Sequence, residues 1–298
     1  MPEMWGVLAA MLSSGLGGTA VGATRYLAST IDPITIGAIR FAGGFLVLLP
    51  VALWRRERWP ERRDWAAIAA LGLLFFGLFP VLFNAALIYT TAARGALALS
   101  TLPLLTMLAG ALLRIEPLTA RKTLGVFIAM AGVAVALGAS LSAAPEGVWR
   151  GDLLMLAAAL CMALYSVWSR PFIERSTPLS FTTIGMGVGA LCLTLLSAQS
   201  GGLARLAGLQ PTQWIASGYL AIVCGAFIFF LWAYALGRAA PTLVAVSVAL
   251  NPVMASLFGV LLLGETVGAN LILGLAAVLL GIGIASGMRL RRAGESAS

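Results

Sequence analysis

The residues of this chain that could do chemistry are suited to holding a ligand by hydrogen bonds, not to breaking covalent bonds. There is no histidine, and all eleven acidic residues fall between apolar stretches or at their ends. The three cysteines, Cys161, Cys192 and Cys224, lie inside apolar stretches without metal-ligand spacing. No nucleophile paired with a base and no phosphate-binding loop is indicated. We therefore expect no enzyme, no metal, no cofactor and no direct use of ATP.

Hydroxyl, amide and aromatic side chains recur about halfway along the apolar stretches. A small-molecule site usually combines an apolar wall with a few hydrogen-bonding groups. The candidates for lining such a cavity are Ser13, Ser14, Phe79, Phe83, Asn84, Ser100, Thr101, Tyr165, Ser166, Trp168, Phe227, Trp232, Ser247 and Asn251. Each of them could instead pack against a neighbouring helix or form a hydrogen bond to one.

Arg40 is the one clear charge inside an apolar stretch. A charge is costly to bury in a bilayer, so a residue of this kind usually serves a function. Arg40 could be the counter-charge of a substrate carboxylate or part of a gate. It could also serve the structure, either by snorkelling outward or by bonding to a helix carbonyl.

Two proline–glutamate pairs stand at equal spacing, Pro103 with Glu116 and Pro252 with Glu265. A proline inside a helix frees the carbonyl one turn earlier and bends the helix. At mid-membrane such a bend can open a cavity and expose backbone oxygens to cargo, and the alternative is a tolerated packing kink. Both glutamates are gate candidates at helix ends. Alternatively, each accepts hydrogen bonds from the first amides of the next helix.

The elements that must position these residues are apolar helices. Hydrophobic residues make up 60% of the chain and charged residues 10%, against about 25% charged in soluble domains. Stretches of about 20 apolar residues can cross a bilayer as helices. The predicted spans are 4–24, 33–54, 65–88, 94–113, 120–140, 151–170, 179–198, 213–236, 242–263 and 268–288. The sequence thus predicts an all-α integral membrane protein embedded in lipid.

The positive charges follow the membrane pattern. The net charge is +8, but the arginines lie in the breaks between apolar stretches and not on one face, so we expect no nucleic-acid partner. Of the nineteen Lys and Arg residues, fourteen fall in one set of alternate loops, four in the other, and the last is Arg40. The set with fourteen includes the residues after the last span, so both termini are predicted to be cytoplasmic.

The chain contains a long internal repeat. Pro103, Glu116, Gly125 and Gly132 recur 149 positions later as Pro252, Glu265, Gly274 and Gly281. Nearer the N-terminus the shift is 145, as in Gly6 with Gly151 and Pro33 with Pro178, so four residues are gained, most simply in the loop from Ser200 to Pro211. Residues 1–145 and 146–298 would each hold five spans. Because five is odd, the second copy must be threaded in the opposite sense, as in many secondary transporters.

The stretches Ala86–Gly132 and Ala235–Gly281 resemble the EamA repeat of the drug/metabolite transporter superfamily. The proline at mid-helix, the glutamate at the helix end and the two following glycines carry the resemblance. It implies ten helices in two inverted repeats around a central cavity lined mainly by helices 1, 3, 4, 6, 8 and 9. The chain departs from the family pattern at Leu16-Gly17, where Trp-Gly is often found, and at Gly185, which stands opposite Arg40.

The resemblance implies a secondary transporter of the bacterial inner membrane that exports small metabolites by alternating access. Amino acids, aromatic or otherwise amphipathic, are the expected substrates, as in amino-acid exporters of the YddG type. A drug or other metabolite carrier is the alternative within the superfamily, and a channel or a membrane enzyme lies outside it. No carboxylate is evident at mid-membrane, which favours a facilitative carrier or exchanger. Ten helices suffice for a monomer.

Overall fold

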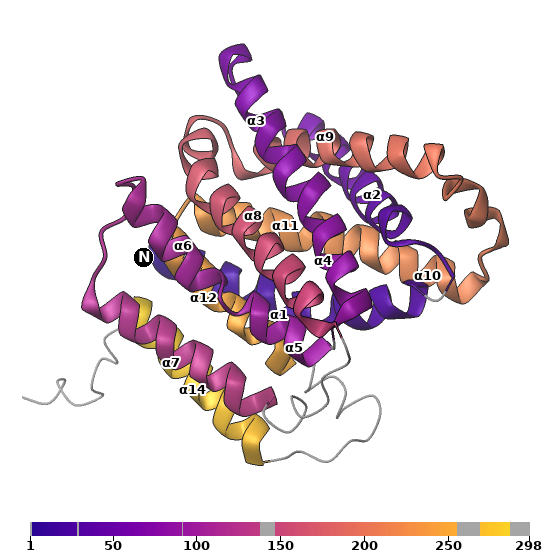
Figure 1. The fold of residues 1–298 in the computed structure, drawn as a ribbon. Coiled ribbons are helices and arrows are strands. Elements are labelled where there is room, and N and C mark those ends of the chain that lie inside the picture. The colour runs from indigo at the N-terminus through magenta and orange to yellow at the C-terminus, as the bar shows by residue number, and fades with distance from the viewer. Residues whose placement is uncertain (1, 29, 91, 138–146, 255–268, 287–298) are drawn as a thin grey trace, which may run out of the picture.

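The computed structural model describes residues 2–28, 30–90, 92–137, 147–254 and 269–286, and these residues form helices joined by short turns, without any strand (Figure 1). In the first half the elements are α1 (Pro2–Ala28), α2 (Pro33–Trp54), the 3₁₀ turn η1 (Arg62–Asp64), α3 (Trp65–Gly72), the π-helix η2 (Leu73–Leu78), α4 (Phe79–Tyr89), α5 (Ala92–Leu99), α6 (Leu102–Leu112) and α7 (Ala120–Leu137).

In the second half the elements are α8 (Val148–Arg175), α9 (Pro178–Gln199), the 3₁₀ segment η4 (Leu203–Gly208), α10 (Pro211–Tyr219), the π-helix η5 (Leu220–Phe227), α11 (Ile228–Leu236), α12 (Pro241–Val246), the 3₁₀ turn η6 (Ser247–Ala249) and α14 (Ala269–Ser286). Helical chain continues from η6 to Met254. The described part of each predicted span therefore falls on helical chain, apart from turns in the fourth. Residues 138–140 of the fifth span, 255–263 of the ninth, and 268 and 287–288 of the tenth lie outside the described residues.

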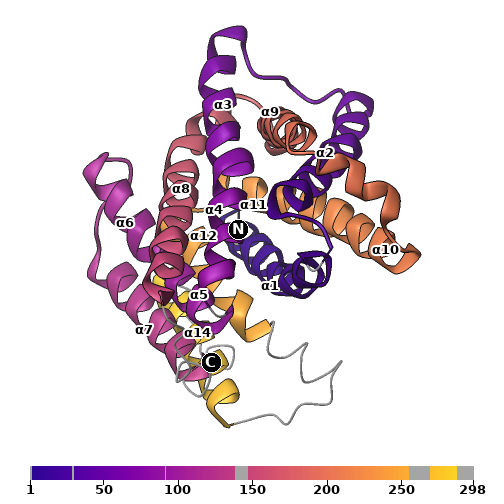
Figure 2. The same cartoon turned by 45° about the vertical axis from the view of Figure 1, so that its right-hand side comes forward.

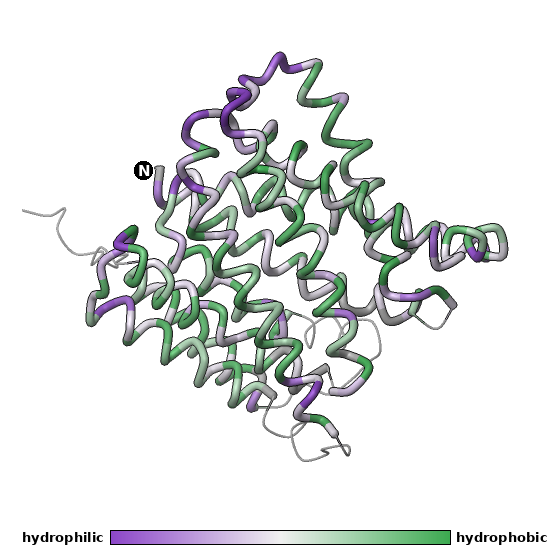
Figure 3. The backbone as a smooth tube through the Cα atoms, turned by 45° about the horizontal axis from the view of Figure 1, so that its top comes forward, coloured by the Kyte–Doolittle hydropathy of each residue, from purple (hydrophilic) through white to green (hydrophobic). Residues whose placement is uncertain are grey.

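Apolar side chains cover the outside of the molecule. The side chains of Leu46, Leu112 and Ile215 are 67%, 82% and 73% exposed, whereas Ser13 and Ser247 are buried in the interior. Five helical segments are long and apolar enough to cross a bilayer: Pro33–Trp54, Arg62–Ala86, Val148–Arg175, Pro178–Gln199 and Pro211–Leu236. Figure 3 shows hydrophilic chain gathered at the ends of the helices and hydrophobic chain between them. This distribution is that of a multi-pass membrane protein.

Helices begin where a capping residue precedes a proline. The Asp32 carboxylate accepts hydrogen bonds from the amides of Ile34 and Thr35, and Pro33 occupies the first turn of α2. Thr177 caps α9 in the same way before Pro178. A proline fits the first turn because its missing N–H has no helical partner there. Asp32 and Thr177 correspond under the shift of 145.

Four of the predicted spans are irregular, and the irregularities recur in both halves. The third span contains η2 and the eighth contains η5, and their last residues, Leu78 and Phe227, are 149 apart. The fourth span is interrupted at Ser100 and Thr101, between α5 and α6, and the ninth turns into a 3₁₀ helix at η6. The sequence predicted a bend at Pro103. The break falls just before it because Pro103 occupies the first turn of α6.

Two helix pairs occupy opposite edges of the molecule. Figures 1 and 2 both show α7 beside α14 at one edge and α2 with α9 at the other. A Cβ atom added at Gly125 would lie 2.6 Å from the carbonyl oxygen of Gly281, and one added at Gly274 would lie 2.7 Å from that of Gly132. The backbones of α7 and α14 therefore touch, as small residues permit between membrane helices.

Candidate functional site

A line of polar side chains lies where α1 packs against α11 and the ninth span. The hydroxyls of Ser14 and Ser247 are 2.8 Å apart, and Ser13 Oγ donates to the Ile228 carbonyl at 2.9 Å. Further along, the Asn251 amide lies against Gly17, where a Cβ would be 3.1 Å from its nitrogen and its oxygen. We call Ser13, Ser14, Ser247 and Asn251 the polar seam. The structure thus brings together four residues that the sequence predicted separately.

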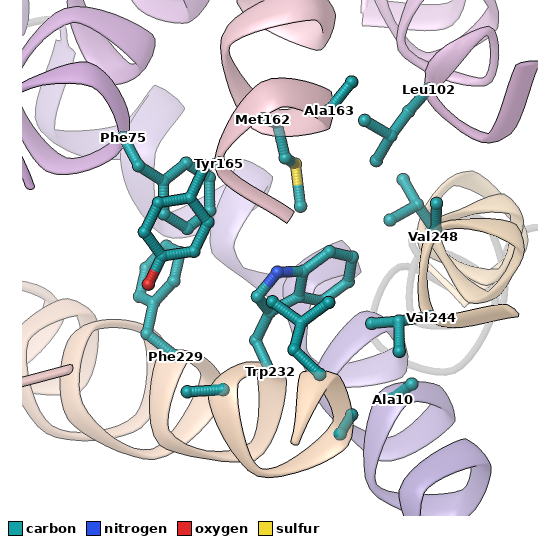
Figure 4. Close-up of a cluster of buried hydrophobic side chains, with 14 of the residues drawn as sticks. Ala10, Phe75, Leu102, Met162, Ala163, Tyr165, Phe229, Trp232, Val244 and Val248 are labelled. Atoms are coloured by element: carbon teal, nitrogen blue, oxygen red, sulfur yellow. The ribbon is translucent and has the colours of Figure 1, made fainter. Parts of the chain in front are cut away.

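Two buried polar atoms on α11 and the ninth span, helices that contact α1, have no hydrogen-bond partner in the described part of the chain. They are Nε1 of Trp232 on α11 and Oδ1 of Asn251. Trp232 is 3% exposed, and Figure 4 shows its indole between Met162 of α8 and Val244 and Val248 of the ninth span. A buried polar group without a partner costs about 1–3 kcal/mol, so it calls for an explanation such as a ligand.

Aromatic rings form one side of the same region. Phe75 stacks on Tyr165 with 4.1 Å between ring centroids, and it also contacts Phe229 at 5.4 Å and Phe79 at 5.3 Å. Phe83 continues the row at 5.8 Å from Phe79. We call these five residues the aromatic wall, part of which is visible in Figure 4. It supplies the apolar surface that a small-molecule site needs beside a few polar groups.

Phe75, Phe229 and Met162 are members of this region that the sequence analysis did not select. Phe75 lies four residues before Phe79, and Phe229 lies three before Trp232. Residues at these spacings share a helix face, which is the signal that would have found them. In contrast, the selected Trp168 and Phe227 are 41% and 45% exposed, and no hydrogen bond or ring contact joins them to the other candidates within the described ranges.

Several other candidates are engaged within their own helices. Ser166 Oγ donates to the Met162 carbonyl and Thr101 Oγ1 to the Ala98 carbonyl, both at 2.7 Å. Ser100 is buried at the interruption of the fourth span. Pro103 and Pro252 are buried as well. These residues shape the broken helices, and a direct part in ligand binding stays a prediction for each.

Arg40 bonds to a helix carbonyl of the other half. Its Nε and Nη2 atoms both donate to the Cys224 carbonyl, at 3.1 and 2.9 Å, and its guanidinium lies over the rings of Phe41 and Phe229 at 5.4 and 5.3 Å. This is the contact that the structural alternative for Arg40 expects. A role as substrate counter-charge stays a prediction.

Glu116 joins the two halves at one end of the molecule. Its Oε1 accepts from Lys122 Nζ at 2.6 Å, and its Oε2 accepts from the amide and hydroxyl of Thr242 at 3.2 and 3.0 Å. The alternative considered from the sequence, a cap on the next helix, is wrong, because the amide belongs to the first turn of α12 in the other half. Glu265 lies outside the described residues.

A second tie between the two halves lies at this end of the molecule, where α2 ends and α3 begins. The Arg175 guanidinium donates to both oxygens of Asp64 at 3.0 and 2.9 Å, and Arg58 donates to the carbonyls of Glu174 and Ser176. Paired N–H groups of this kind give well-oriented ion pairs. Together with Glu116, these contacts fasten the first half to the second at the arginine-rich end.

A pocket of about 510 Å³ opens at the other end of α2, where Asp32, Asn84 and Arg205 are among its lining residues. Asn84 Nδ2 donates to the Pro33 carbonyl at 3.1 Å. Partial burial by itself would raise the pKa of the Asp32 carboxyl. The hydrogen bonds from the Thr35 hydroxyl and from the Thr35 and Ile34 amides outweigh it and hold this pKa below its ordinary value.

Comparison with known proteins identifies the family. The model of the EamA-like transporter family matches residues 4–138 and again residues 149–287. An uncharacterized protein of Pseudomonas aeruginosa, PA1977, is 34% identical over 271 residues, which are 89% of this chain and 88% of the relative. The uncharacterized transporter YyaM of Bacillus subtilis is 25% identical over 89% of this chain and 88% of its own.

Two further matches concern function and fold. A probable terminal-alkyne amino-acid exporter of Streptantibioticus cattleyicolor is 28% identical over 211 residues, 70% of this chain and 68% of the relative. A crystal structure of a protein of undescribed function superposes on this chain with a TM-score of 0.75. The match covers 96% of this chain and 98% of the chain in the crystal, at 24% sequence identity. That structure shows a shared fold.

Proposed function

Because the chain belongs to the EamA-like transporter family, we propose that it is a secondary carrier that exports small amphipathic metabolites, most of all amino acids, by alternating access. The family is one of transporters, and two of the named relatives are described as a transporter and an exporter, which points to a carrier and not to an enzyme. The proposal places the protein in the bacterial inner membrane with both termini in the cytoplasm. It takes residues 1–145 and 146–298 as one transport unit that can work as a monomer.

The helix packing supports two inverted repeats. Under exchange of the halves, the contact of α4 with α8 corresponds to that of α1 with α11, and both are present. The close pair Gly125–Gly281 becomes Gly274–Gly132, which is also a close pair. One set of contacts used twice in opposite senses gives two conformations of similar energy, one open to each side.

The ends of the molecule suggest which conformation the structure holds. Glu116, Asp64 and Arg58 fasten the halves together at the arginine-rich end, which the positive-inside rule places in the cytoplasm. The pocket beside Asp32 lies at the opposite end. We therefore interpret the structure as a carrier that is closed toward the cytoplasm and open toward the outside.

The proposal for the site rests on two unpaired groups, the indole N–H of Trp232 and the side-chain amide oxygen of Asn251. Trp232 offers a donor about one helical turn from Phe229 of the aromatic wall (Figure 4), and Asn251 offers an acceptor where it lies against Gly17 of α1. The carboxylate of a zwitterion with an apolar side chain could accept a hydrogen bond from the indole N–H. Its ammonium group could donate one to the amide oxygen. The relative from Streptantibioticus cattleyicolor is described as a probable terminal-alkyne amino-acid exporter, which supports an amino acid as the substrate. The buried acids in the described residues, Asp64 and Glu116, lie at helix ends, which favours a facilitative carrier or exchanger.

Counterflow into proteoliposomes tests this function. Vesicles preloaded with an unlabelled amino acid should accumulate the labelled one, and the rate should saturate with concentration and rise with substrate on the far side. A panel of aromatic, aliphatic and charged amino acids, with cationic drugs as the alternative class, would identify the substrate. Uptake that stays linear and unaffected by the far side would contradict a carrier and indicate a channel.

A further inference from the structure

The π-helix η5 leaves a backbone carbonyl without its usual partner. In a regular helix the amide of Ile228 would bond to the carbonyl of Cys224, four residues earlier. Here the Ile228 amide bonds to the Val223 carbonyl, five residues earlier. Inside a bilayer no water competes for a freed carbonyl, so a donor from the protein that reaches it stabilises the helix there.

Arg40 is the group that does so. Two of its N–H groups converge on the Cys224 oxygen, and its planar face covers the ring of Phe229, which belongs to the aromatic wall. The contact is very close: a Cβ added at Gly225 would lie 2.4 Å from the Arg40 carbonyl oxygen. Arg40 thus ties α2 of the first half to the helix that carries Phe229 and, one turn later, Trp232.

The corresponding π-helix of the first half lacks such a tie. In η2 the Phe79 amide bonds to the Leu74 carbonyl, the same departure at the matching residues. The counterpart of Arg40 is Gly185, whose carbonyl oxygen would lie 2.4 Å from a Cβ at Gly72. No side chain reaches η2 from that position, so the tie is specific to the half that presents Trp232.

We propose that Arg40 is a positioning residue of the transport site, which compensates for the π-helix η5 and so holds Phe229 and Trp232 in place. This inference rests on the proposed carrier function. It differs from a counter-charge because the Nε and Nη2 of Arg40 point at a backbone oxygen and its face is covered by aromatic rings. The role belongs to the planar fork of the guanidinium, which lysine does not supply.

The first test compares two substrates that differ only in charge. Arg40→Ala should slow counterflow of a transported amino acid and of its uncharged amide by the same factor, about tenfold, because the site is displaced for both. Arg40→Lys should recover little of the lost counterflow rate. A variant that loses the amino acid alone, with the amide transported at the wild-type rate, would overturn the proposal in favour of a counter-charge.

The second test removes the need for Arg40. Deleting one residue within a π-turn returns it to regular α-helical bonding, which gives the Cys224 carbonyl a backbone partner. Deletion of Ile222, whose side chain is 55% exposed, should therefore recover both the transport rate and the melting temperature in detergent of the Arg40→Ala protein. Deletion of its counterpart Leu73, 43% exposed in η2, is the matched control and should recover neither.

Counterflow and melting temperature together separate the proposed carrier function from the proposed role of Arg40. If the wild-type protein showed no counterflow of any substrate, the carrier function would be contradicted, while the melting temperatures would still report on Arg40. Recovery of the melting temperature by the Ile222 deletion and not by the Leu73 deletion supports the tie. Equal behaviour of the two deletions would overturn it.

Discussion

The polar seam has an apolar counterpart at the symmetry-related positions of the fourth and sixth spans. Where the first and ninth spans meet, two serine hydroxyls pair and an amide lies against Gly17. The corresponding positions of the sixth and fourth spans carry alanine, leucine and methionine. Ser13, Ser14, Ser247 and Asn251 correspond to Ala158, Ala159, Ala98 and Leu102, and Gly17 corresponds to Met162. The helices repeat, but the hydrogen-bonding groups do not.

This difference separates two requirements. Alternation between two conformations needs a symmetric frame, which the glycine contacts and the paired π-helices supply. Recognition of an asymmetric small molecule needs donors and acceptors on one side only. In the polar seam the three serines have partners within the protein, so the buried amide oxygen of Asn251 is the group left for a ligand. Exchanging residues between the two seams is the direct way to test this interpretation.

The largest effect is expected from Asn251→Leu, which gives the polar seam the residue of its counterpart. Counterflow should fall by about 100-fold, because a ligand would lose its acceptor in a buried site. The melting temperature should stay equal or rise, since the buried amide oxygen without a partner is removed. The control, Leu102→Asn, should lower the melting temperature and leave transport by the folded protein intact. Wild-type transport by Asn251→Leu would contradict the role of the seam.

Glu116→Ala should come next, because Glu116 anchors the first turn of the helix that carries the seam. Three hydrogen bonds to Lys122 and Thr242 are lost, and the mostly buried ammonium group of Lys122 loses its partner. We expect transport to fall about tenfold together with the melting temperature. Glu116→Gln keeps an acceptor for Thr242 and should be milder. Two variants of equal severity would show that the ion pair with Lys122 accounts for the whole effect.

Trp232→Phe isolates a single N–H, since phenylalanine is the residue that stands at the matching position 83. An aromatic six-membered ring is kept, and the pyrrole ring with its unpaired donor is removed. Counterflow should drop about fivefold with a smaller loss of stability, because the smaller ring leaves a small cavity. Measuring Vmax and KM separately would show whether the donor binds the resting substrate or acts during transport. A fall in stability equal to the fall in transport would point to packing instead.

Removing the serine pair should have a smaller effect. Ser14→Ala or Ser247→Ala alone should each cost about 1 kcal/mol, because one hydroxyl loses a partner. The double variant, which reproduces Ala159 and Ala98, should cost less than the sum of the two. Thermal unfolding of the four proteins gives the coupling energy directly. Strict additivity would mean that the two hydroxyls do not interact.

The smallest effect is expected from replacing Asp32, the cap of α2, by threonine, the residue that caps α9 at position 177. The folded pKa of Asp32 lies below its unfolded value of 3.8, so its contribution is present above that value and is lost as the pH falls through the folded pKa. Thr177 does not titrate. Asp32→Thr should therefore abolish part of the acid sensitivity of the melting temperature below about pH 4, with a change near 1 kcal/mol. Unchanged acid sensitivity would exclude Asp32 as its source.

Composition predicted the elements well because the physical cause is local. Twenty apolar residues between charged turns form a helix whatever lies beside them, so the described parts of the predicted spans fall on helical chain. Pro103 also indicated the interruption of the fourth span, whereas the chain stays helical through Pro252, three residues after the 3₁₀ turn η6. The π-helices could not be foreseen, since no residue type in Leu73–Leu78 or Leu220–Phe227 demands them.

The site was predicted only in part because lipid removes the usual signal of burial. In water an apolar side chain points inward, but in a bilayer it can face either way, so Phe227 and Phe229 look alike in sequence. Polar residues are more informative, and the polar seam was found through them. The partners of Arg40 and Glu116 lie in the other half of the chain and depend on how the halves pack.

The contact between α7 and α14 has a consequence for the origin of the chain. Each glycine face fits an inverted copy of itself, which makes the interface isologous in the sense used for twofold dimers. Two separate half-length chains bearing this face could associate as an antiparallel twofold pair in a membrane. Duplication and fusion of such a chain would need no new interface here, only a linker between the two copies.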